Sequence, residues 1–433
     1  MRVAFHTLGC KVNQYETEAM KNQFTEKNHT VVLETEPADV YIINTCSVTS
    51  LADRKSRQYI RKMKKISPDA VVAVTGCYAQ VNTEEVANIE GVNLVIGTNE
   101  KPHLVEYVLD YVKEHRKDID TSHVLKYEEL GDFVDWGTVI SSESRTRAYV
   151  KIQEGCNRFC TYCIIPYARG PVRSRKANDV IDECKTLVAN GYKEIILTGI
   201  NTALCDNLEE IFQALEDMEG EFRVRLSSLE PTVINADYVK GLFKYKRLCH
   251  HLHLSLQAGS DKILSAMNRR YNRDEYLEIV KTLYSFDPHY GITTDIIVGF
   301  PGETDEDFED SIDMVEKCGF CKVHAFKYSR RTGTKAADMP DQIMPTVKKQ
   351  RSKKLMDFAE TVSKGFCEKN IGTVREVLFE EYDERTGAVT GYTDNYIRCY
   401  FICEKDQAEK YVNRILPVNI LEVFNDGVKV SLK

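Results

Sequence analysis

Three cysteines lie close together near the middle of the chain, at Cys156, Cys160 and Cys163, with the spacing C-x3-C-x2-C. A [4Fe–4S] cluster is normally held by four thiolates, so three thiolates leave one iron with an open coordination position. An open position separates a reactive metal site from a closed structural one, as it does for zinc. Such a cluster can bind S-adenosylmethionine and cleave it reductively to a radical, while the protein supplies ligation and shielding.

A structural zinc site is the alternative for this motif, because C-x2-C pairs also hold zinc. Zinc sites of that kind usually take a fourth Cys or His from nearby. No histidine occurs in the twenty residues after Cys163, and the next cysteine, Cys184, falls in a helical pattern. The spacing therefore favours the open cluster.

Three further cysteines each follow a predicted strand in the first part of the chain. Cys10, Cys46 and Cys77 follow, after one or two further residues, the apolar runs at residues 3–7, 39–44 and 70–75. The carboxyl ends of parallel strands meet at one edge of a sheet, where ligands bind in open α/β folds. A single cysteine there would be an ordinary small buried residue, but three at equivalent positions predict a second cluster with three thiolates.

The pattern of strands and helices expected around these cysteines predicts an α/β protein of three domains. Residues 1–120 alternate strands and helices, which indicates a parallel-sheet α/β domain, and 121–145 is predicted as a linker. Six strand–helix repeats over 146–365 are too few for an eight-fold barrel, so they predict a partial (β/α)6 barrel with its site at the carboxyl ends of the strands. Residues 366–433 predict a small all-β barrel.

Other strand ends of the central domain carry residues suited to a bound nucleoside. Gly199 and Asn201 end its second strand, and Gln257 follows the fourth. Gly and Asn at such positions usually serve turns, yet here they recur on the edge that holds the cysteine motif. Arg169, shortly after that motif, is suited to a carboxylate or phosphate.

Composition places the chain among ordinary globular proteins. Its 433 residues are 42% hydrophobic and 29% charged, and fourteen cysteines occur without a secretion signal, which predicts reduced thiols or metal ligands. No apolar stretch approaches 18 residues, so we expect a cytoplasmic protein without a membrane partner.

The net charge of −8 argues against a chain that is basic overall, but residues 51–65 carry seven Lys and Arg with one acid. A solvated helix face is the usual explanation, and a contact with a nucleic-acid backbone is the alternative.

The all-β segment has aromatic and basic residues that would form a stacking face for RNA: Tyr392, Tyr396, Arg398, Tyr400 and Phe401. From residue 366 onward there are nine Lys and Arg against twelve Asp and Glu, so a plain interaction domain is the alternative.

Two motifs give the chain a resemblance to a known family. Thr7-Leu8-Gly9-Cys10-Lys11-Val12-Asn13-Gln14 and the run from Glu154-Gly155-Cys156 to Arg173-Ser174-Arg175 resemble the radical SAM methylthiotransferases, over the whole chain. Within that family, the residues near Cys10 and the stretch 199–204 are most similar to enzymes that act on threonylcarbamoyladenosine in tRNA.

The resemblance implies a role for each site residue. Cys156, Cys160 and Cys163 would hold the radical-generating [4Fe–4S] cluster. A second, auxiliary [4Fe–4S] cluster, bearing the sulfur, would be held by Cys10, Cys46 and Cys77. The resemblance also implies contacts to S-adenosylmethionine, from Tyr162, Gly199, Asn201 and Gln257. The C-terminal barrel would be a TRAM-like domain that grips RNA.

The implied reaction methylthiolates C2 of N6-threonylcarbamoyladenosine at position 37, in the anticodon stem-loop of tRNA. One S-adenosylmethionine would supply the methyl group and a second the radical that removes hydrogen from C2, a bond that acid–base catalysis activates poorly. Two alternatives remain at this point. One is a methylthiotransferase for isopentenyladenosine or a ribosomal-protein aspartate, and the other is a non-catalytic iron–sulfur protein that binds RNA or senses redox state.

Overall fold

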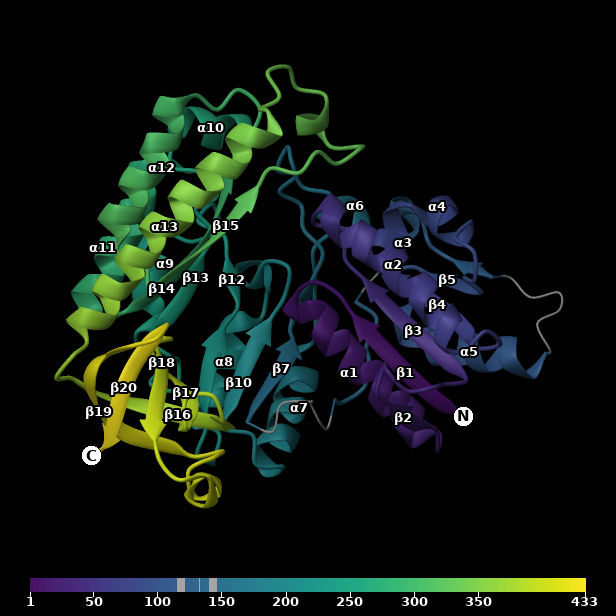
Figure 1. The fold of residues 1–433 in the computed structure, drawn as a ribbon, viewed down its shortest axis with the longest axis horizontal. Coiled ribbons are helices and arrows are strands. Elements are labelled where there is room, and N and C mark those ends of the chain that lie inside the picture. Colours follow the sequence, from purple (N-terminus) through teal and green to yellow (C-terminus); the bar gives the residue numbers. More distant parts are fainter. Residues whose placement is uncertain (115–120, 132, 140–145) are drawn as a thin grey trace.

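A computed structural model of the chain describes residues 1–114, 121–131, 133–139 and 146–433 (Figure 1). Its N-terminal part is a six-stranded parallel sheet in the order β2-β1-β3-β4-β5-β6. The strands are β1 (Arg2–Thr7), β2 (Thr30–Val32), β3 (Val40–Thr45), β4 (Val71–Gly76), β5 (Leu94–Ile96) and β6 (Ser122–His123). The central strands β3 and β4 are buried along their whole length, as continuous apolar runs in parallel sheets usually are.

Helices cover both faces of this sheet: α1 (Lys11–Glu26), α2 (Ser50–Ile66), α3 (Cys77–Val81), α4 (Thr83–Ala87) and α5 (Leu104–Lys113). Alternate strand residues point to opposite sides, so one core packs α1 and α5 against the sheet and the other packs α2, α3 and α4. The segment predicted as a linker contributes to this domain, because β6 pairs with β5 and Trp136 and Val139 are buried beside α1.

The central part forms an incomplete barrel of parallel strands. One sheet holds β7 (Arg147–Lys151), β10 (Glu194–Thr198) and β11 (Arg223–Leu226), and the next holds β12 (Ser228–Leu229), β13 (His251–Leu254), β14 (Gly291–Val298) and β15 (Lys322–Lys327). A single residue separates β11 from β12, so the two sheets run on as one curved wall of six strands. The predicted partial (β/α)6 barrel is therefore confirmed.

Seven helices of the central part lie outside or after the strands: α7 (Ala177–Ala189), α8 (Leu208–Asp217), α9 (Ala236–Leu242), α10 (Asp261–Ala266), α11 (Arg273–Phe286), α12 (Asp305–Cys318) and α13 (Pro345–Lys369). The largest core of the protein fills the space between these helices and the wall of strands. Beside β7, the short elements β8 (Gln153–Glu154), α6 (Ile165–Arg169) and β9 (Arg173–Ser174) frame the cysteine loop. Single 3-10 turns occur at η1 (Lys101–His103), η2 (Tyr127–Glu129), η3 (Thr202–Leu204), η4 (Lys335–Ala337) and η5 (Lys405–Lys410).

The C-terminal part is a closed five-stranded barrel, as predicted, in the order β16-β17-β18-β20-β19. Its strands are β16 (Val374–Asp383), β17 (Ala388–Thr393), β18 (Arg398–Ile402), β19 (Ile415–Phe424) and β20 (Gly427–Leu432). Closure leaves no free strand edge. Across the described residues, no helix is long and apolar enough to cross a membrane.

The turn between β17 and β18 plugs the amino end of the central barrel. Tyr396 stacks on His251 with ring centroids 4.4 Å apart, and Arg223 donates to the Tyr392 carbonyl at 2.9 Å. Arg225 donates to the carbonyl of Asp394 at 3.0 Å. The rings of Tyr392 and Tyr396 are therefore occupied in the contact between the two barrels, and they do not form the RNA-stacking face predicted for them. The C-terminal barrel therefore covers the amino end of the central barrel, and the cysteine loop lies at the opposite end, at the carboxyl ends of the strands.

Candidate active site

The first three cysteines lie at the carboxyl ends of the neighbouring strands β1, β3 and β4. The loop before Cys10 touches the loop of Cys46, since Leu8 N donates to the Asn44 carbonyl at 2.9 Å. Gly9 has φ +103°, and a Cβ there would lie 2.8 Å from Sγ of Cys46. Glycine is thus required for this close approach, which brings Cys10 next to Cys46.

Cys77 completes this group as the first residue of α3. Burial raises the pKa of Cys46 to about 12, and the nearby thiols of Cys77 and Cys10 add to that effect. Burial also raises the pKa of Cys77, against the lowering influence of Arg169 and Lys101. All three are free thiols. Metal ions bind the thiolate form of cysteine, so iron would displace the protons of Cys46 and Cys77, whose pKa values burial raises.

The spacing of the thiols suits a cluster better than a single ion. Within the described ranges, one group alone brings three ligand atoms within 4.8 Å of one another, and it consists of His253, Asp295 and His324. The cysteine sulfurs are spread more widely than that. Each ligand of an iron–sulfur cluster binds a different iron, so three converging but separated thiols fit a cluster.

The second cysteine group lies in the loop that follows β7 and β8. Gly155 has φ +72°, and a Cβ there would lie 1.8 Å from the Pro171 carbonyl, so this position requires glycine. Thr161 holds the loop to the end of α10, since its hydroxyl donates to the Ala266 carbonyl at 2.8 Å. Burial raises the pKa of Cys163 to about 12, and the Cys160 and Cys156 thiols contribute. The three thiols therefore lie near one another, with the same donor chemistry as the first group.

A buried polar network supports this loop from the inside of the barrel. Arg269 pairs with Glu230 at 2.7 Å and donates to the Tyr162 hydroxyl at 2.8 Å. Asn201 donates from Nδ2 to Glu230 at 3.3 Å, while its Oδ1 is buried without a hydrogen-bond partner. A buried unsatisfied acceptor costs free energy, so Oδ1 is suited to a donor group on a ligand. Glu230 and Arg269 were not predicted from the sequence.

Gly199 and Gln257 lie where the sequence placed them, at the ends of β10 and β13. A Cβ on Gly199 would lie 2.9 Å from Gln153 Oε1. Gln257 has a left-handed backbone with φ +67°. That conformation is fixed by two bonds of β14, since Gln257 N donates to the Asp295 carbonyl and Ile297 N donates to Gln257, both at 2.8 Å. Left-handed non-glycine residues cluster at ligand sites.

A second buried network joins the two cysteine groups. Glu16 of α1 is fully buried and pairs with Lys101, with Lys151 of β7 at 2.7 Å and with Arg169 at 2.8 Å. Arg169 also pairs with Glu154 at 3.0 Å. The sequence carried one signal for this network, because Glu16 interrupts the apolar face of α1. Arg169 was predicted to bind a carboxylate, and in the structure it pairs with the carboxylates of Glu16 and Glu154 of the chain itself. Lys101 and Lys151 come from distant segments and left no local signal.

Lys11 also projects toward the central barrel, from the start of α1. Burial lowers its pKa to about 8, and Arg225 of β11 adds to the lowering. The start of α1 therefore brings a cationic side chain close to charged residues of the central barrel.

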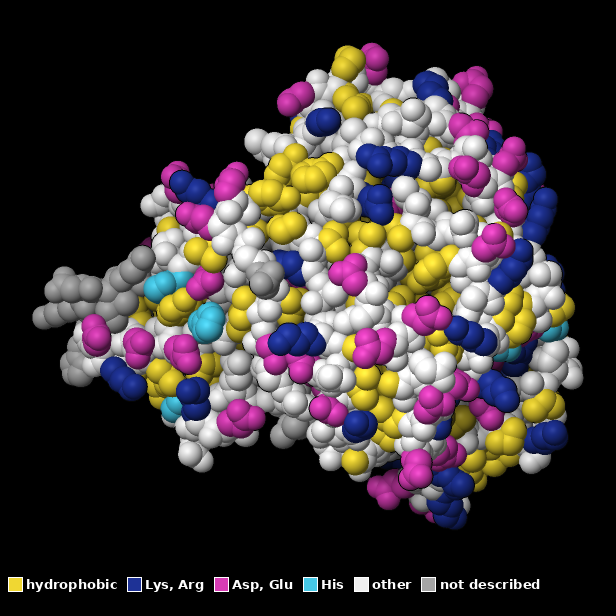
Figure 2. Space-filling model, turned by 180° about the vertical axis from the view of Figure 1, so that it is seen from behind, with side chains coloured by type: hydrophobic (Ala, Val, Ile, Leu, Met, Phe, Trp, Pro, Cys, Tyr) yellow, Lys and Arg dark blue, Asp and Glu magenta, His cyan; other side chains and the backbone are white. Residues whose placement is uncertain are grey.

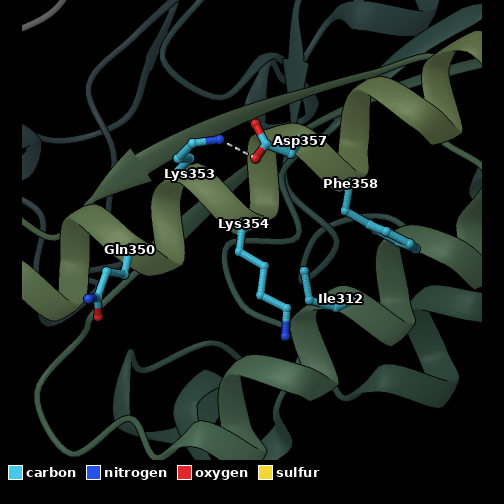
Figure 3. A pocket seen from close by; sticks show the side chains of 6 residues that line it. All are labelled: Ile312, Gln350, Lys353, Lys354, Asp357 and Phe358. Atoms are coloured by element: carbon cyan, nitrogen blue, oxygen red, sulfur yellow. Dashed lines mark hydrogen bonds and ion pairs between the residues drawn. The ribbon is translucent and has the colours of Figure 1, made fainter.

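Two other surface features are less suited to chemistry. A groove of about 470 Å³ lies between α12 and α13, on the outside of the barrel, lined by Ile312, Gln350, Lys353, Lys354, Asp357 and Phe358 (Figure 3). None of the cysteines lines it. On the face turned away from Figure 1, acidic and basic side chains are interspersed (Figure 2).

Comparison with known proteins identifies two regions of the chain. Residues 150–315 match the radical SAM superfamily, and residues 2–97 match a group described as uncharacterized protein family UPF0004. The solved structure of TsrM from Kitasatospora setae, a radical S-adenosylmethionine methyltransferase, covers 78% of this chain and 77% of its own, with a TM-score of 0.59 and 15% identity. That likeness confirms the fold.

Full-length relatives give the family. The chain is 40% identical to the threonylcarbamoyladenosine tRNA methylthiotransferase MtaB of Bacillus subtilis, over 98% of this chain and 95% of that one. It is 38% identical to the protein of the same name from Aquifex aeolicus, over 88% and 93%. A tRNA-2-methylthio-N(6)-dimethylallyladenosine synthase of Carboxydothermus hydrogenoformans is 36% identical, over 86% and 87%. With its radical SAM region and relatives of this similarity along nearly its whole length, the chain belongs to the radical SAM methylthiotransferase family.

Proposed function

We propose that this protein methylthiolates C2 of N6-threonylcarbamoyladenosine at position 37 of the tRNA anticodon loop. The observation that carries the proposal is the meeting of two cysteine groups across a domain boundary, joined through Arg169. Arg169 contacts Cys77 and pairs with Glu154, two residues before Cys156. Relatives named for threonylcarbamoyladenosine are 36–40% identical to the chain, and those named for dimethylallyladenosine 33–36%.

The two cysteine groups have separate tasks in this proposal. Cys156, Cys160 and Cys163 hold a [4Fe–4S] cluster that, with S-adenosylmethionine bound, supplies the radical chemistry. Cys10, Cys46 and Cys77 hold a second [4Fe–4S] cluster on the opposite side of the substrate. Cys46 and Cys77 are buried and Cys10 is exposed, so two of the three ligands of this cluster are shielded from water, which limits side reactions.

The protein residues around the first cluster orient S-adenosylmethionine. Asn201 offers its unpaired Oδ1 to a donor on the cofactor. Gly199 presents its backbone next to Asn201, with Gln153 packed where a Cβ would lie, and Gln257 presents its side chain from a fixed left-handed backbone. Tyr162 packs edge-on to Phe300 with centroids 6.4 Å apart, which supports a role beside the adenine.

The tRNA is held through the N-terminal domain in this proposal. Helix α2 begins four residues after Cys46, so its basic face starts next to the group of Cys10, Cys46 and Cys77. Arg54, Lys55 and Arg61 are exposed on it, and exposed cations of this density suit a phosphate backbone. The TRAM-like barrel adds contacts through surfaces other than Tyr392 and Tyr396.

Nucleoside analysis of tRNA from a strain that lacks the gene tests the proposal. We expect 2-methylthio-N6-threonylcarbamoyladenosine to disappear and N6-threonylcarbamoyladenosine to accumulate. The wild-type gene restores the product, and a Cys46→Ala gene does not. Persistence of the product, or loss of the methylthio form of isopentenyladenosine instead, would overturn the assignment. Absence of S-adenosylmethionine cleavage by the anaerobically reconstituted protein would favour a non-catalytic iron–sulfur protein.

A further inference from the structure

A group of three polar side chains lies inside the central barrel, away from the cysteines. His253, Asp295 and His324 come from the neighbouring strands β13, β14 and β15, and Asp295 is directly opposite His324 in the register. Their ligand atoms all lie within 4.8 Å of one another. On β15, Val323 and Ala325 pack toward the helices. Since successive strand residues alternate, His324 faces the opposite side, the inside of the barrel.

A chain of hydrogen bonds fixes how this group presents its polar atoms. His253 Nε2 is 3.2 Å from Asp295 Oδ2, and its Nδ1 is 3.0 Å from the Thr293 hydroxyl. That hydroxyl also lies 3.0 Å from His251 Nε2. A single arrangement satisfies the chain with neutral rings if His253 donates to Asp295, because Thr293 then donates to His253 and accepts from His251. Asp295 is thereby held as an acceptor.

Lys11 enters the same space from the other domain. It directly follows Cys10, and its ammonium interacts electrostatically with Arg225, Glu194 and Asp295. Burial lowers the pKa of His324, and the positive charge of Lys11 adds to that lowering. In the part of the chain that the structure describes, no hydrogen bond or ion pair within 4.0 Å holds the ammonium of Lys11. A half-buried cation without a direct partner is suited to an anionic ligand.

Resting on the proposed function, we infer that Lys11 and the His253–Asp295–His324 group together bind the threonylcarbamoyl substituent of the target adenosine, with Lys11 on its carboxylate. The substituent carries one carboxylate, one hydroxyl and the N–H groups of a urea. Lys11 supplies the cation for the carboxylate, and Asp295 accepts from a hydroxyl or N–H. The group is therefore a specificity determinant of the same active site.

The same residues disfavour a dimethylallyl substituent. That group has no polar atom, so binding it would remove water from Lys11 and Asp295 without replacing their hydrogen bonds. Sites built to hydrogen-bond a substrate reject analogues that lack the partner much more strongly than apolar pockets reject polar ones. The polar lining thus favours a threonylcarbamoyl substituent over a dimethylallyl substituent, the two substituents for which the relatives are named.

A metal ion is the competing occupant of the three-residue group. Two imidazoles and a carboxylate suit zinc or ferrous iron. The positive charge of Lys11, which acts on Asp295 and His324, opposes a divalent cation, however, and favours an organic anion. The proposal therefore commits to the substituent.

Removing the charge of the substrate carboxylate and the charge of Lys11, separately and together, tests whether the two groups are in contact. The probes are two anticodon stem-loop RNAs, one with N6-threonylcarbamoyladenosine and one in which its carboxylate is replaced by the carboxamide. For the wild-type holoenzyme we expect kcat/KM to be about ten- to hundredfold higher with the carboxylate, the size of a hydrogen bond between charged groups. In Lys11→Gln the two RNAs should react equally, and Lys11→Arg should restore the preference.

Control measurements separate loss of the carboxylate contact from damage to the protein. Iron content and S-adenosylmethionine cleavage without RNA must match the wild type in Lys11→Gln, which separates recognition from damage to the cluster beside it. A preference for the carboxylate that survives in Lys11→Gln overturns the inference. Failure of the wild type on the natural RNA overturns the proposed function instead.

The barrel group is tested with Asp295→Asn and the dimethylallyl RNA. We expect Asp295→Asn to lower kcat/KM about tenfold or more for the threonylcarbamoyl RNA and to reduce the discrimination against the dimethylallyl RNA. Unchanged discrimination would overturn the role of this group. So would a stoichiometric zinc or iron ion that remains when all six cluster cysteines are alanine and is lost on adding His324→Ala.

Discussion

Nε of Arg169 lies 3.4 Å from Sγ of Cys77 and donates a hydrogen bond to it across the boundary between the N-terminal sheet and the central barrel. The same guanidinium pairs with Glu16 of the first domain and Glu154 of the second. Arg169 is fully buried. This side chain therefore helps to fix the distance between the two cysteine groups, which a transfer from one site to a substrate at the other requires.

Replacing Arg169 should destabilise the joint between the domains. Arg169→Met leaves Glu16 and Glu154 buried with fewer cations, and breaking a buried ion pair costs about 3–5 kcal/mol. We expect the urea midpoint of the apoprotein to fall accordingly. Arg169→Lys is the matched control, since it keeps the charge and should recover part of the loss. An Arg169→Met protein as stable as the wild type would contradict this role.

The joint between the central barrel and the C-terminal barrel should weaken in acid. Burial alone would raise the pKa of Glu194, but the guanidinium groups of Arg225 and Arg223 hold it well below its ordinary range. A lowered folded-state pKa contributes stability above the unfolded pKa of about 4.3, and that stability is lost as the pH falls toward the folded value.

Glu194→Gln isolates this effect from the other carboxylates of the protein. At neutral pH the variant should be less stable by about 3 kcal/mol, because Arg223 and Arg225 lose their buried anion. The difference between wild type and variant in urea unfolding should shrink below about pH 4, because the carboxyl of Glu194 takes up a proton there in the unfolded chain while it stays ionised in the folded protein. A difference that stays constant from neutral pH to pH 3 would exclude Glu194 as the source.

Much of the fold was predictable because its signals are local. Apolar runs with a period of two or of 3.6 residues set the strands and helices, and cysteines placed directly after strands put Cys10, Cys46 and Cys77 at one sheet edge. The network around Arg169 was not predictable, since Glu16, Lys101 and Glu154 are joined only by the packing of two domains. The tyrosines of the C-terminal barrel show the same limit. Tyr396 is a residue type that often stacks on RNA bases, yet the docking of one barrel on the other engages its ring in stacking on His251.

The backbone of Gln257 makes a separate prediction about the cofactor site. A β-branched residue is strained at φ +67°, so Gln257→Val should cost about 1–3 kcal/mol of stability. Gln257→Gly removes the strain together with the side chain, and its thermal midpoint should match or exceed that of the wild type. If the side chain contacts S-adenosylmethionine, Gln257→Gly raises KM for the cofactor without loss of stability. An unchanged KM would leave Gln257 with a backbone role alone.

The basic face of α2 predicts a salt-dependent contact with tRNA. Exchanging Arg54, Lys55 and Arg61 for Gln should raise KM for tRNA, while S-adenosylmethionine cleavage without RNA stays unchanged. Each lost phosphate contact lowers the slope of log affinity against log salt by about one, so a slope reduced by up to three is expected in binding titrations. The matched control exchanges the exposed Lys185, Lys240 and Lys317, which pair with acids on their own outer helices. If both triple variants lose tRNA affinity equally, the cause is the change in net charge and not a contact of α2. If the salt slope of the α2 variant is unchanged, α2 does not contact the tRNA.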